Sequence, residues 1–430
     1  MTTSTHAEAL RAPTGTHDVM PGESERWIAL LGVFASLVEK AGFGLIHTPL
    51  FEDVRLFRRG VGTETEVVGK EMYEFEDKGG RAMALRPEGT ASVVRAVIQH
   101  HPTMPFKAWY ATPTFRYERP QAGRYRQHHQ VGVEVLGISD PDLDVEVLEL
   151  AVDYLHALGL SGFTLRLNSL GDPACRPAYL DELQCYLTAH VGELCDEHAG
   201  KIDANPLRIL DCKRETCRSV SAAAPSMADA LCAECATHHD RVRAGLDAHG
   251  VAYQNDAALV RGLDYYTRTT FEITIPIEGS ELTILGGGRY DGLVAALGGE
   301  DTPGIGFGSG IERVLLACDG QGAFAVAPSV PEVFIIDTTD GTIARDVVAK
   351  LRRAGIAADR GYGGRSMKSQ MKSADRSGAK FALIVGSKEA AAGTITIRDL
   401  RGDGTQHEVD ASTLVASLAA LTTTPKDLHS

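Results

Sequence analysis

The sequence predicts an α+β protein that contains an antiparallel sheet with flanking helices, a helical insertion and a separate C-terminal α/β domain. Three observations support this fold class. Short alternating stretches follow one another over residues 43–136, with a hairpin-turn signal at 78–80, as neighbouring antiparallel strands do. Residues 171–255 have a helical pattern and many cysteines. Beyond residues 323–331, strand and helix patterns alternate.

The first part of the chain begins with a helix, expected over residues 24–42. Trp27, Leu30 and Phe34 belong to its apolar stripe, and Gly42 ends it. The next elements are expected to be strands at 43–50, 72–76, 83–86, 108–118 and 129–136, an amphipathic helix at 145–155 and a strand at 163–168. Because the strands are short and close in sequence, antiparallel pairing is favoured.

The strand pattern stops at residue 171 and resumes over 259–275, so the helical segment between them is interpreted as an insertion. Small residues and two prolines mark 323–331 as a linker. The C-terminal elements are expected as strands at 333–337, 381–385 and 394–398 and helices at 342–354, 366–377 and 411–421. The predicted organisation is a first domain in two parts, 1–170 and 256–325, the insertion 171–255 and a C-terminal domain 331–430.

Composition and charge limit the class of protein. The 430 residues are 43% hydrophobic and 23% charged, as in ordinary globular proteins, and no apolar run approaches the ~20 residues of a membrane span. The N-terminal 18 residues contain no apolar signal region, so we expect a cytoplasmic protein without membrane attachment. The formal net charge of −14 argues against non-specific nucleic-acid binding. Residues 350–380 nevertheless contain nine Lys or Arg against two Asp, which indicates a local polyanion site.

The most informative segment is 115–137, FRYERPQAGRYRQHHQVGVEVLG, which has the pattern of two strands joined by a polar loop. The part of the segment before the return strand contains four arginines and one acid, Glu118. The return strand alternates valines with Gly132, Glu134 and Leu136. Ionised groups in a buried hairpin are unfavourable unless a partner meets them, and the guanidinium fork suits phosphate oxygens. The alternative is a solvated charged hairpin.

Two segments that are distant from 115–137 in the sequence contain residues that could act in the same site. They are RGLDYYTRTTFE at 261–272 and the glycine-rich 286–313, with GGGRYDG and TPGIGFGSGIER. The second does not have the strand–turn–helix context and acidic residue of a dinucleotide-binding fingerprint. No Gly-Lys-Ser/Thr follows the triple glycine, so a P-loop is also excluded.

The three segments together resemble the histidyl-tRNA synthetase family of class II aminoacyl-tRNA synthetases. The hairpin is similar to class II motif 2, 261–272 to the family's histidine-binding box, and 302–313 to motif 3. RPEGTASVVRAV at 86–97 and TPLFE at 48–52, in a region similar to motif 1, also fit. The resemblance extends over roughly residues 14–421. It implies the class II antiparallel sheet in the first domain, a C-terminal anticodon-binding domain and a homodimer.

The resemblance also implies an activity. L-histidine would react with ATP to give histidyl-adenylate and pyrophosphate, with Mg²⁺ as cofactor, and the histidyl group would pass to the terminal ribose of the histidine tRNA. Arg116 and Arg261 would act at the α-phosphate of ATP as the catalytic arginines, and Arg313 would reach its γ-phosphate. Such cations neutralise the charge that develops as pyrophosphate leaves. The alternative for Arg313 is a salt bridge at a helix start.

By the same resemblance, Glu134 and Tyr266 would recognise the imidazole nitrogens of histidine. Glu88 would hold the α-amino group, although an acid at a helix N-terminus is the alternative for that residue. The remaining residues expected at bound histidine are Thr90, Gln130, Tyr265, Gly286 and Gly288. The residues expected at tRNA are Arg119, Gln121 and Arg124 in the hairpin loop and Arg365, Lys368 and Lys372 in the basic segment. Arg268 departs from the pattern, because many relatives have glycine there; it either adds a cation near ATP or points to solvent.

Eight cysteines raise the question of a metal. Cys212-x₄-Cys217 and Cys232-x₂-Cys235 are similar in spacing to zinc ligands, and Cys195-x₂-His198 lies just before them. One structural zinc held by Cys212, Cys217, Cys232 and Cys235 is therefore expected within the insertion. The alternative is reduced thiols in helix cores, since a cytoplasmic location disfavours disulfides.

Two other functions compete with the ligase. A synthetase-like regulatory subunit, such as the partner of ATP phosphoribosyltransferase, would bind histidine without charging tRNA. Such proteins typically lack the C-terminal domain and the arginines, whereas this chain has both. A class II enzyme for proline, threonine or glycine is the second competitor, and the RGLDYY box at 261–266 argues against it.

Overall fold

The computed structural model describes residues 9–62, 65 and 67–422. The chain divides into two compact units, Met1–Val326 and Ala327–Ser430. In the described part of the first unit, the largest sheet has eight strands. In spatial order they are β1 (Gly44–Leu45), β5 (Phe106–Phe115), β6 (Gln127–Leu136), β11 (Gly304–Gly310), β10 (Ser280–Arg289), β9 (Thr267–Ile277), β7 (Thr164–Ser169) and β8 (Gln254–Asn255). All neighbours are antiparallel except the edge pairs β1–β5 and β7–β8, so the predicted antiparallel sheet is confirmed.

The predicted hairpin forms the centre of this sheet. β5 and β6 pair without interruption from Phe106 opposite Leu136 to Phe115 opposite Gln127. The valines of β6 are fully buried in the core of the unit, while the alternate residues face the opposite side. This alternation decides which residues of β6 can reach a ligand.

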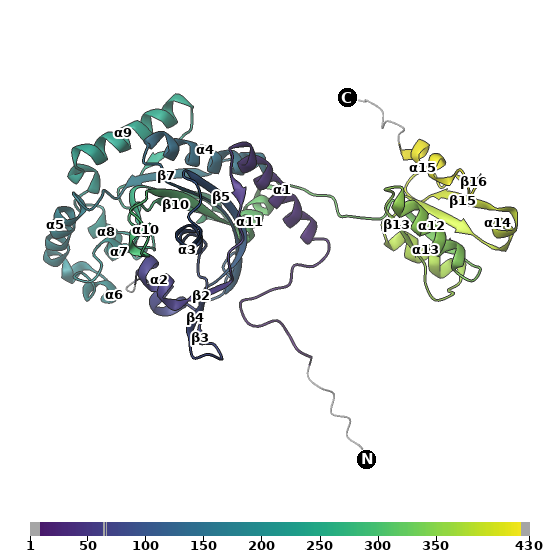
Figure 1. The fold of residues 1–430 in the computed structure, drawn as a ribbon, viewed down its shortest axis with the longest axis horizontal. Coiled ribbons are helices and arrows are strands. Elements are labelled where there is room, and N and C mark those ends of the chain that lie inside the picture. The colour runs from purple at the N-terminus through teal and green to yellow at the C-terminus, as the bar shows by residue number, and fades with distance from the viewer. Residues whose placement is uncertain (1–8, 63–64, 66, 423–430) are drawn as a thin grey trace, which may run out of the picture. The chain divides into compact units, whose positions relative to one another are not determined.

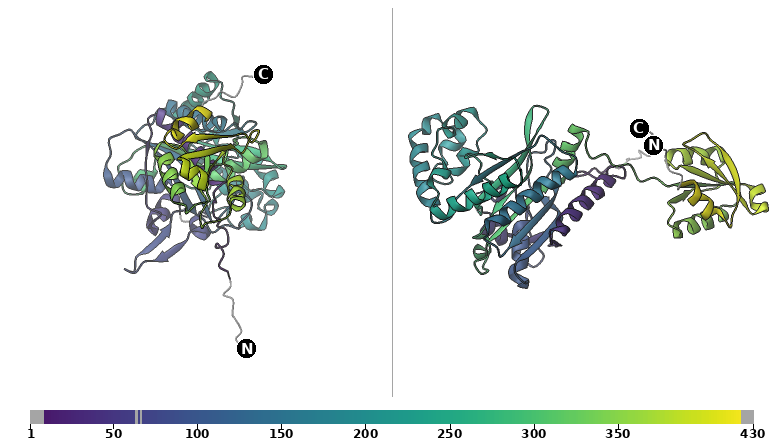
Figure 2. Two further views of the ribbon diagram at one scale, coloured as in Figure 1. Left: turned by 90° about the vertical axis from the view of Figure 1, so that its right-hand side faces the viewer. Right: turned by 90° about the horizontal axis from the view of Figure 1, so that it is seen from above.

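One face of the sheet is covered by helices. α1 (Ser24–Lys40), α4 (Pro141–Ala157) and α11 (Ile311–Gln321) share a hydrophobic core with the strands. Within it the Phe34 ring contacts Trp109 and Tyr154 edge-on, at ring-centroid distances of 6.0 and 5.0 Å. Figure 2 shows this helical layer from above, beside the strands. The predicted helices 24–42 and 145–155 are confirmed, the second with longer bounds.

The other face is approached by α2 (Val54–Val61), α3 (Thr90–His100), α10 (Leu293–Ala296) and a small sheet of β2 (Phe51–Asp53), β4 (Ala82–Leu85) and β3 (Glu74–Glu76). A π-helical turn, Val67–Glu71, precedes β3. The predicted strand at 43–50 is wrong beyond Leu45. The Arg86 guanidinium binds the carbonyls of Thr48 and Pro49 at 3.1 and 3.2 Å, so these groups take a side chain as their partner instead of a strand.

The insertion is helical, as its sequence pattern predicts, and gathers in teal at one end of the first unit in Figure 1. Its elements are α5 (Arg176–Ala189), α6 (Asp196–Ala199), α7 (Leu207–Leu210), α8 (Glu215–Ser221) and α9 (Ala233–Ala248), with 3₁₀ turns at Val191–Glu193 and Met227–Ala230. α9 packs on α4, where the buried His238 contacts Asp144 at 2.8 Å. The insertion is therefore joined to the helical layer over the sheet.

The second unit contains its own mixed sheet, in the order β13 (Ala358–Arg360), β12 (Val333–Asp337), β14 (Phe381–Val385), β15 (Thr394–Asp399) and β16 (Gln406–Asp410). Its helices are α12 (Thr342–Arg353), α13 (Met367–Arg376), α14 (Ser387–Ala392) and α15 (Leu414–Thr422). One core lies between the sheet, α12 and α15, and a smaller one between the sheet and α13. The predicted elements are confirmed to within about three residues; β13, β16 and α14 were not predicted.

In the described residues, no helix combines the length and the apolar character needed to cross a membrane. The expectation drawn from the N-terminal 18 residues rests partly on residues 1–8, which lie outside the described residues.

Candidate active site

A cavity of about 440 Å³ opens where the β5–β6 hairpin, the β9–β10 hairpin and the β11–α11 junction meet. Arg116 of the β5–β6 loop, Arg261 of the segment before β9 and Arg313 of α11 all line it, as do Gln130 and Gly286. The three predicted phosphate-binding arginines are therefore brought together. In the sequence, these arginines are more than 50 residues apart from one another. They become neighbours only because the strands of the sheet pair.

Two of these arginines are held by backbone carbonyls. Arg116 donates from Nε to the Pro87 carbonyl at 2.9 Å. Arg313, in the first turn of α11, donates to the carbonyls of Gly123 at 3.0 Å and Thr283 at 2.9 Å. Among the described residues, no carboxylate lies within ion-pair distance of either guanidinium. The salt bridge considered for Arg313 is thus not formed, and both cations remain available to an anion.

The electrostatics of neighbouring groups agree with this excess of positive charge. Burial, and next the nearby Arg124, lowers the pKa of Arg313 to about 10. Burial lowers the pKa of His128 to about 3, with further contributions from Arg116 and Arg313. A polyanion bound between these groups would relieve their mutual repulsion. His128 was not predicted as a site residue, and nothing in its sequence position distinguishes it from His129.

Arg261 is arranged differently, because it forms an ion pair with the Glu272 carboxylate across the same cavity wall. Burial disfavours the charged guanidinium, but Glu272 overcomes this and raises the pKa of Arg261. Glu272 also accepts a hydrogen bond from Thr283 at 3.3 Å. Glu272 was missed by the sequence reasoning, although it ends the RGLDYYTRTTFE segment.

The glycines of β10 are explained by what they pack against. A side chain at Gly286 would occupy the space of the Arg261 guanidinium, and one at Gly288 would meet the Thr269 carbonyl at 2.6 Å. Gly288 would also approach the ring of Tyr266 at 2.9 Å. These positions were expected to face bound histidine; in the structure they also let Arg261 and Tyr266 approach the strand.

Beside the cavity, Glu134 lies fully buried in a ring of hydroxyl groups. Its carboxylate accepts hydrogen bonds from Thr90 at 2.7 Å, Tyr290 at 2.5 Å and Tyr110 at 3.3 Å. Burial raises the pKa of Glu134 to about 8, although the hydroxyls of Tyr290 and Thr90 oppose the shift. Tyr110 and Tyr290 were not predicted, since a tyrosine on a strand has no sequence signal that separates a site residue from a core residue.

Glu88 stands at the N-terminus of α3. Its carboxylate accepts from the backbone N–H groups of Thr90 at 2.6 Å and Ala91 at 2.8 Å. This is the helix-terminal arrangement that the sequence analysis named as the alternative. Burial raises the pKa of Glu88, and these N–H groups counteract the shift. Through Thr90, which also bonds Glu134, the cap of α3 is tied to the hydroxyl ring.

Tyr265 and Tyr266 close the wall between Arg261 and this ring. Their ring centroids are 4.7 Å apart, and Tyr265 lies 5.9 Å from Tyr290. Side chains of the insertion hold the backbone of the loop that contains these tyrosines. Arg176 of α5 donates to the Tyr266 carbonyl at 2.5 Å, and Arg208 of α7 donates to the Gly262 carbonyl at 3.1 Å. Both arginines were missed, because their role depends on docking of the insertion.

The loop between β5 and β6 is a tight turn. Gln121 and Arg124 exchange backbone hydrogen bonds of 3.1 and 2.8 Å, and the Gly123 carbonyl between them binds Arg313. The side chains of Arg119, Gln121 and Arg124 are exposed, and Arg124 lies 3.6 Å from Glu118. Arg268 neither approaches the ATP-side arginines nor points freely to solvent. It has a φ of 47°, a backbone conformation that favours glycine, and it contacts Asp172 at 3.3 Å.

In the second unit, Arg365, Lys368 and Lys372 are exposed at and just before α13. Near them, Gly361, Gly363 and Gly364 border a hollow of about 300 Å³. Tyr362, 61% exposed, stands beside it, with the Arg360 guanidinium 4.4 Å from its ring centroid. An exposed aromatic next to basic side chains is a common feature of single-stranded nucleic-acid surfaces. Tyr362 was not predicted.

The structure does not bring the four predicted zinc ligands together. Cys212 and Cys217 group with Cys195 and His198, whereas Cys232 and Cys235 group with Cys175 and Asp172. The sequence reasoning joined the two cysteine pairs because they are close along the chain. The fold separates them: Cys217 lies in α8, and the 3₁₀ turn Met227–Ala230 comes before Cys232 at the start of α9.

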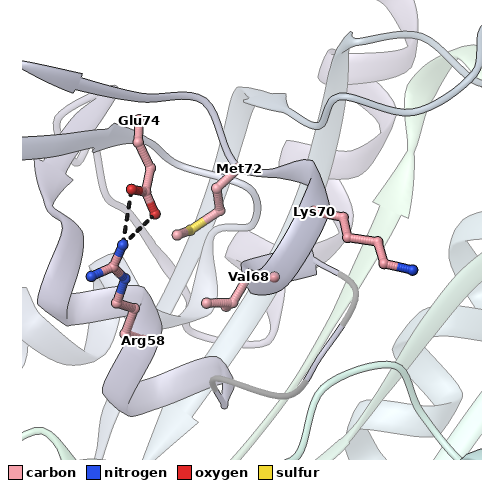
Figure 3. A pocket seen from close by; sticks show the side chains of 6 residues that line it. Arg58, Val68, Lys70, Met72 and Glu74 are labelled. Atoms are coloured by element: carbon pink, nitrogen blue, oxygen red, sulfur yellow. Dashed lines mark hydrogen bonds and ion pairs between the residues drawn. The ribbon is translucent and has the colours of Figure 1, made fainter.

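A further hollow, of about 530 Å³, lies between α2 and β3 and is lined by Arg58, Val68, Lys70, Met72 and Glu74 (Figure 3). Both carboxylate oxygens of Glu74 accept from Arg58, at 3.0 and 2.9 Å. The charges at this end of the hollow are thus already paired. It lacks the convergent cations of the first cavity and is not a candidate for phosphate chemistry.

Comparison with known proteins gives a consistent result. Residues 15–314 match the family model described as histidyl-tRNA synthetase, and residues 326–421 match the anticodon binding domain. The chain is similar to the histidine–tRNA ligase of Desulforamulus reducens, with 47% identity over 95% of this chain and 99% of the relative. It is 48% identical to that of Desulforudis audaxviator, over 94% and 97% of the two chains. The solved structure of apo histidyl-tRNA synthetase from S. aureus matches with a TM-score of 0.80 and 35% identity, over 95% and 99% of the chains.

Proposed function

The chain belongs to the histidyl-tRNA synthetase family, and from this we propose that it is a histidine–tRNA ligase whose adenylation site is the arginine-lined cavity. A carboxylate oxygen of histidine attacks the α-phosphorus of ATP, and the bond to the β-phosphate breaks to release pyrophosphate. A hydroxyl of the terminal tRNA ribose then attacks the carbonyl carbon of histidyl-adenylate, and AMP leaves. The observation that carries the proposal is the convergence of three arginines beside the buried Glu134.

We assign Arg116 and Arg261 to the α-phosphate of ATP and Arg313 to its γ-phosphate. Arg116 and Arg313 are fixed by carbonyls and keep their charge uncompensated, so they suit the phosphate oxygens on which negative charge is concentrated. Arg261 is held by Glu272 against the strand, which supports a role at the reacting α-phosphate. A rigid, preorganised cation stabilises developing charge without reorganising as the reaction proceeds.

Mg²⁺ fits the same cavity, because the carboxylates of Glu118 and Glu281 line it near the arginines. Protein sites for Mg²⁺ commonly use one or two carboxylates together with substrate phosphates. When bound, the ion would neutralise phosphate charge.

Histidine recognition is assigned to the hydroxyl ring. Glu134 and Tyr266 are proposed to meet the two imidazole nitrogens, with Gln130, Tyr265, Gly286 and Gly288 around the ligand. Glu88 has its carboxylate at the α3 N-terminus, and with Thr90 it forms the α-amino side of the pocket. A site built from buried groups that need a hydrogen-bonding partner rejects amino acids that lack one.

The tRNA is proposed to contact both units. Arg119, Gln121 and Arg124 would meet its acceptor end from the exposed hairpin loop, and Arg365, Lys368 and Lys372 would meet the backbone of the anticodon arm. Tyr362 offers a stacking surface for an unpaired base. Such a protein would work as a homodimer in the cytoplasm. Support for the dimer comes from apolar side chains left exposed near β2, including Leu50, Phe51 and Phe75.

The test is ATP–pyrophosphate exchange with each amino acid in turn, followed by aminoacylation of histidine tRNA. Exchange that depends on histidine alone, with transfer to tRNA, supports the proposal. Exchange with another amino acid would overturn it, and histidine binding without exchange would favour a regulatory subunit. Light scattering on the same protein measures the dimer.

A further inference from the structure

The insertion contains two groups of potential metal ligands. The outer group is Cys195, His198, Cys212 and Cys217, and the inner group is Asp172, Cys175, Cys232 and Cys235. Within each group, one ligand atom per residue lies within 4.8 Å of all the others. Each group thus has the number of donors that a closed tetrahedral site uses.

The distances agree with the size of such a site. Zinc–sulfur bonds of ~2.3 Å and zinc–nitrogen bonds of ~2.0–2.1 Å place ligand atoms roughly 3.5–3.8 Å apart at tetrahedral angles. In the outer group, the Sγ atoms of Cys195 and Cys217 lie 3.2 and 3.8 Å from Nδ1 of His198. In the inner group, Sγ of Cys175 lies 3.5 Å from Oδ1 of Asp172. All eight cysteines are free thiols, so disulfides do not account for the clustering.

The backbone around both groups is arranged as it is around metal-bound thiolates. Three of the ligand pairs have two residues between their members: Asp172–Cys175, Cys195–His198 and Cys232–Cys235. Backbone N–H groups point at sulfur in both groups. Cys195 N–H donates to Cys217 Sγ at 3.3 Å, and Cys235 N–H donates to Cys232 Sγ at 3.5 Å. Such second contacts fix the ligands and stabilise thiolate charge.

We propose that each group binds one Zn²⁺, so that the chain holds two structural zinc ions in place of the single one expected from its sequence. The outer site has three thiolates and one imidazole, and the inner site has three thiolates and one carboxylate. The outer set is one that zinc takes in four-coordinate structural sites, and the carboxylate oxygen of the inner set is also a zinc ligand. Neither set leaves an open position for a substrate.

The inner zinc joins the first and last helices of the insertion at its root. Asp172 and Cys175 lead into α5, and Cys232 and Cys235 begin α9. Asp172 also accepts from Arg268 at the start of β9. The same end of α5 supplies Arg176, which holds the Tyr266 carbonyl. The inner site therefore fixes the part of the insertion that supports the proposed histidine-binding loop.

The outer zinc site is connected to the arginine-lined cavity through the chain on either side of its ligand Cys212. The residues on either side of Cys212, Asp211 and Lys213, both line the arginine-lined cavity. α7, which ends just before Cys212, supplies Arg208 to the Gly262 carbonyl. Each ion would thus stabilise one segment that borders the proposed active site, although neither ion lies within that site. This consequence rests on the proposed function; the presence of the metals does not.

The test begins with metal analysis of the full-length protein, prepared without a His tag. About two equivalents of zinc per chain are expected. Cys212→Ser with Cys217→Ser should lose one of them, and Cys175→Ser with Cys235→Ser should lose the other. Cys185→Ser, at an exposed cysteine outside both groups, is the matched control and should keep both. Iron in place of zinc, or one equivalent that both double variants abolish, would overturn the two-zinc assignment.

A second measurement uses the unaltered protein, in case a variant fails to fold. With a mercurial reagent, the exposed Cys185 should react first, and zinc should be released only as the six ligand thiols react. Less than about a fifth of an equivalent of zinc, with those six thiols freely reactive in the native protein, would overturn the proposal. Strong chelation should raise the KM for histidine in exchange several-fold. If the protein shows no exchange at all, the zinc count still decides the metal sites.

Discussion

Glu134 on β6 and Gly306 on β11 stand directly opposite each other, and the Glu134 carboxylate fills the space that a side chain at position 306 would take. The same register sets Gly308 opposite Gly132 and Gly310 opposite Gln130. The alternate glycines of GIGFGSG are therefore the counterpart of the β6 residues that face the site. A dinucleotide-binding role was excluded from their sequence context, and the structure gives them a different purpose.

Gly306→Ala should strongly lower histidine activation and also reduce stability, because a carbon added at Gly306 would meet the Val133 carbonyl as well as the Glu134 carboxylate. The added methyl group displaces the Glu134 carboxylate, and a misplacement of about 1 Å at a substrate-binding group lowers turnover by about 10²-fold. The measurement is kcat/KM for histidine in ATP–pyrophosphate exchange. Gly292→Ala, where nothing lies within 4 Å of the added carbon, is the control and should behave as wild type. Normal exchange in Gly306→Ala would remove Glu134 from the histidine pocket.

The stability of the first unit should depend on pH through Glu134. Its folded-state pKa is about 8, against an ordinary value of 4.5, so between these values the folded protein holds a proton that the unfolded chain has lost. The wild type should therefore lose about 1.4 kcal/mol of unfolding free energy per pH unit relative to Glu134→Gln, from pH ~5 to ~8, with no further loss above. Below pH ~4.5, Glu134 is protonated in both the folded and the unfolded wild type. The difference in unfolding free energy between wild type and Glu134→Gln should then no longer change with pH.

Urea unfolding followed by tryptophan fluorescence measures this difference, because Trp27 and Trp109 both belong to the first unit. The exposed Glu300 supplies the control, since Glu300→Gln should follow the wild type at every pH. A difference between wild type and Glu134→Gln that does not change from pH 5 to pH 8 would contradict the prediction.

The ion pair of Arg261 and Glu272 allows catalysis to be separated from structure. Arg261→Ala should lower kcat for exchange by ~10²-fold or more, because it removes a cation that stabilises the transition state. The substitution also leaves Glu272 uncompensated, which by itself would repel ATP. The double variant Arg261→Ala/Glu272→Gln removes that repulsion and should remain as slow as the single variant. Recovery in the double variant would show that Arg261 only neutralises Glu272.

The two units should divide the reaction. A chain that ends at Val326, the boundary between them, should still catalyse histidine-dependent exchange, because every proposed adenylation residue precedes it. Its aminoacylation of tRNA should fall much further, mainly through a raised KM for tRNA. Circular dichroism and light scattering establish that the shortened chain is folded and whether it dimerises. Charging as efficient as that of the full chain would exclude the second unit as the anticodon reader.

Charge reversal at Arg365, Lys368 and Lys372 should raise the KM for tRNA by ~10-fold or more and reduce its salt dependence, without changing exchange. Tyr362→Ala should raise the same KM and Tyr362→Phe should not, since the ring and not the hydroxyl would stack on a base. Lys388→Glu, an exposed lysine at the start of α14, is the control for net charge. A KM for tRNA that stays unchanged in the triple variant would make this segment an ordinary solvated surface.

The sequence by itself determined the local elements and the chemistry that each segment contributes. The alternation of β6, the glycine-rich strand before α11, the helical insertion and the C-terminal strands all follow from neighbours in the chain, because burial on one face imposes a period of 2 or 3.6. It also predicted that Arg116, Arg261 and Arg313 belong to one site, through motifs that keep their order.

Only the tertiary structure decided which groups meet. It set Tyr110 and Tyr290 around Glu134, paired Arg261 with Glu272 and divided four cysteines between two groups of ligands. It also placed the Glu88 carboxylate on the first backbone N–H groups of α3 and paired Arg268 with Asp172. These contacts depend on strand register and on the docking of the insertion, which arise from packing over long separations. A period read along the chain contains no information about them, because it specifies the face of an element and not the element that will cover it.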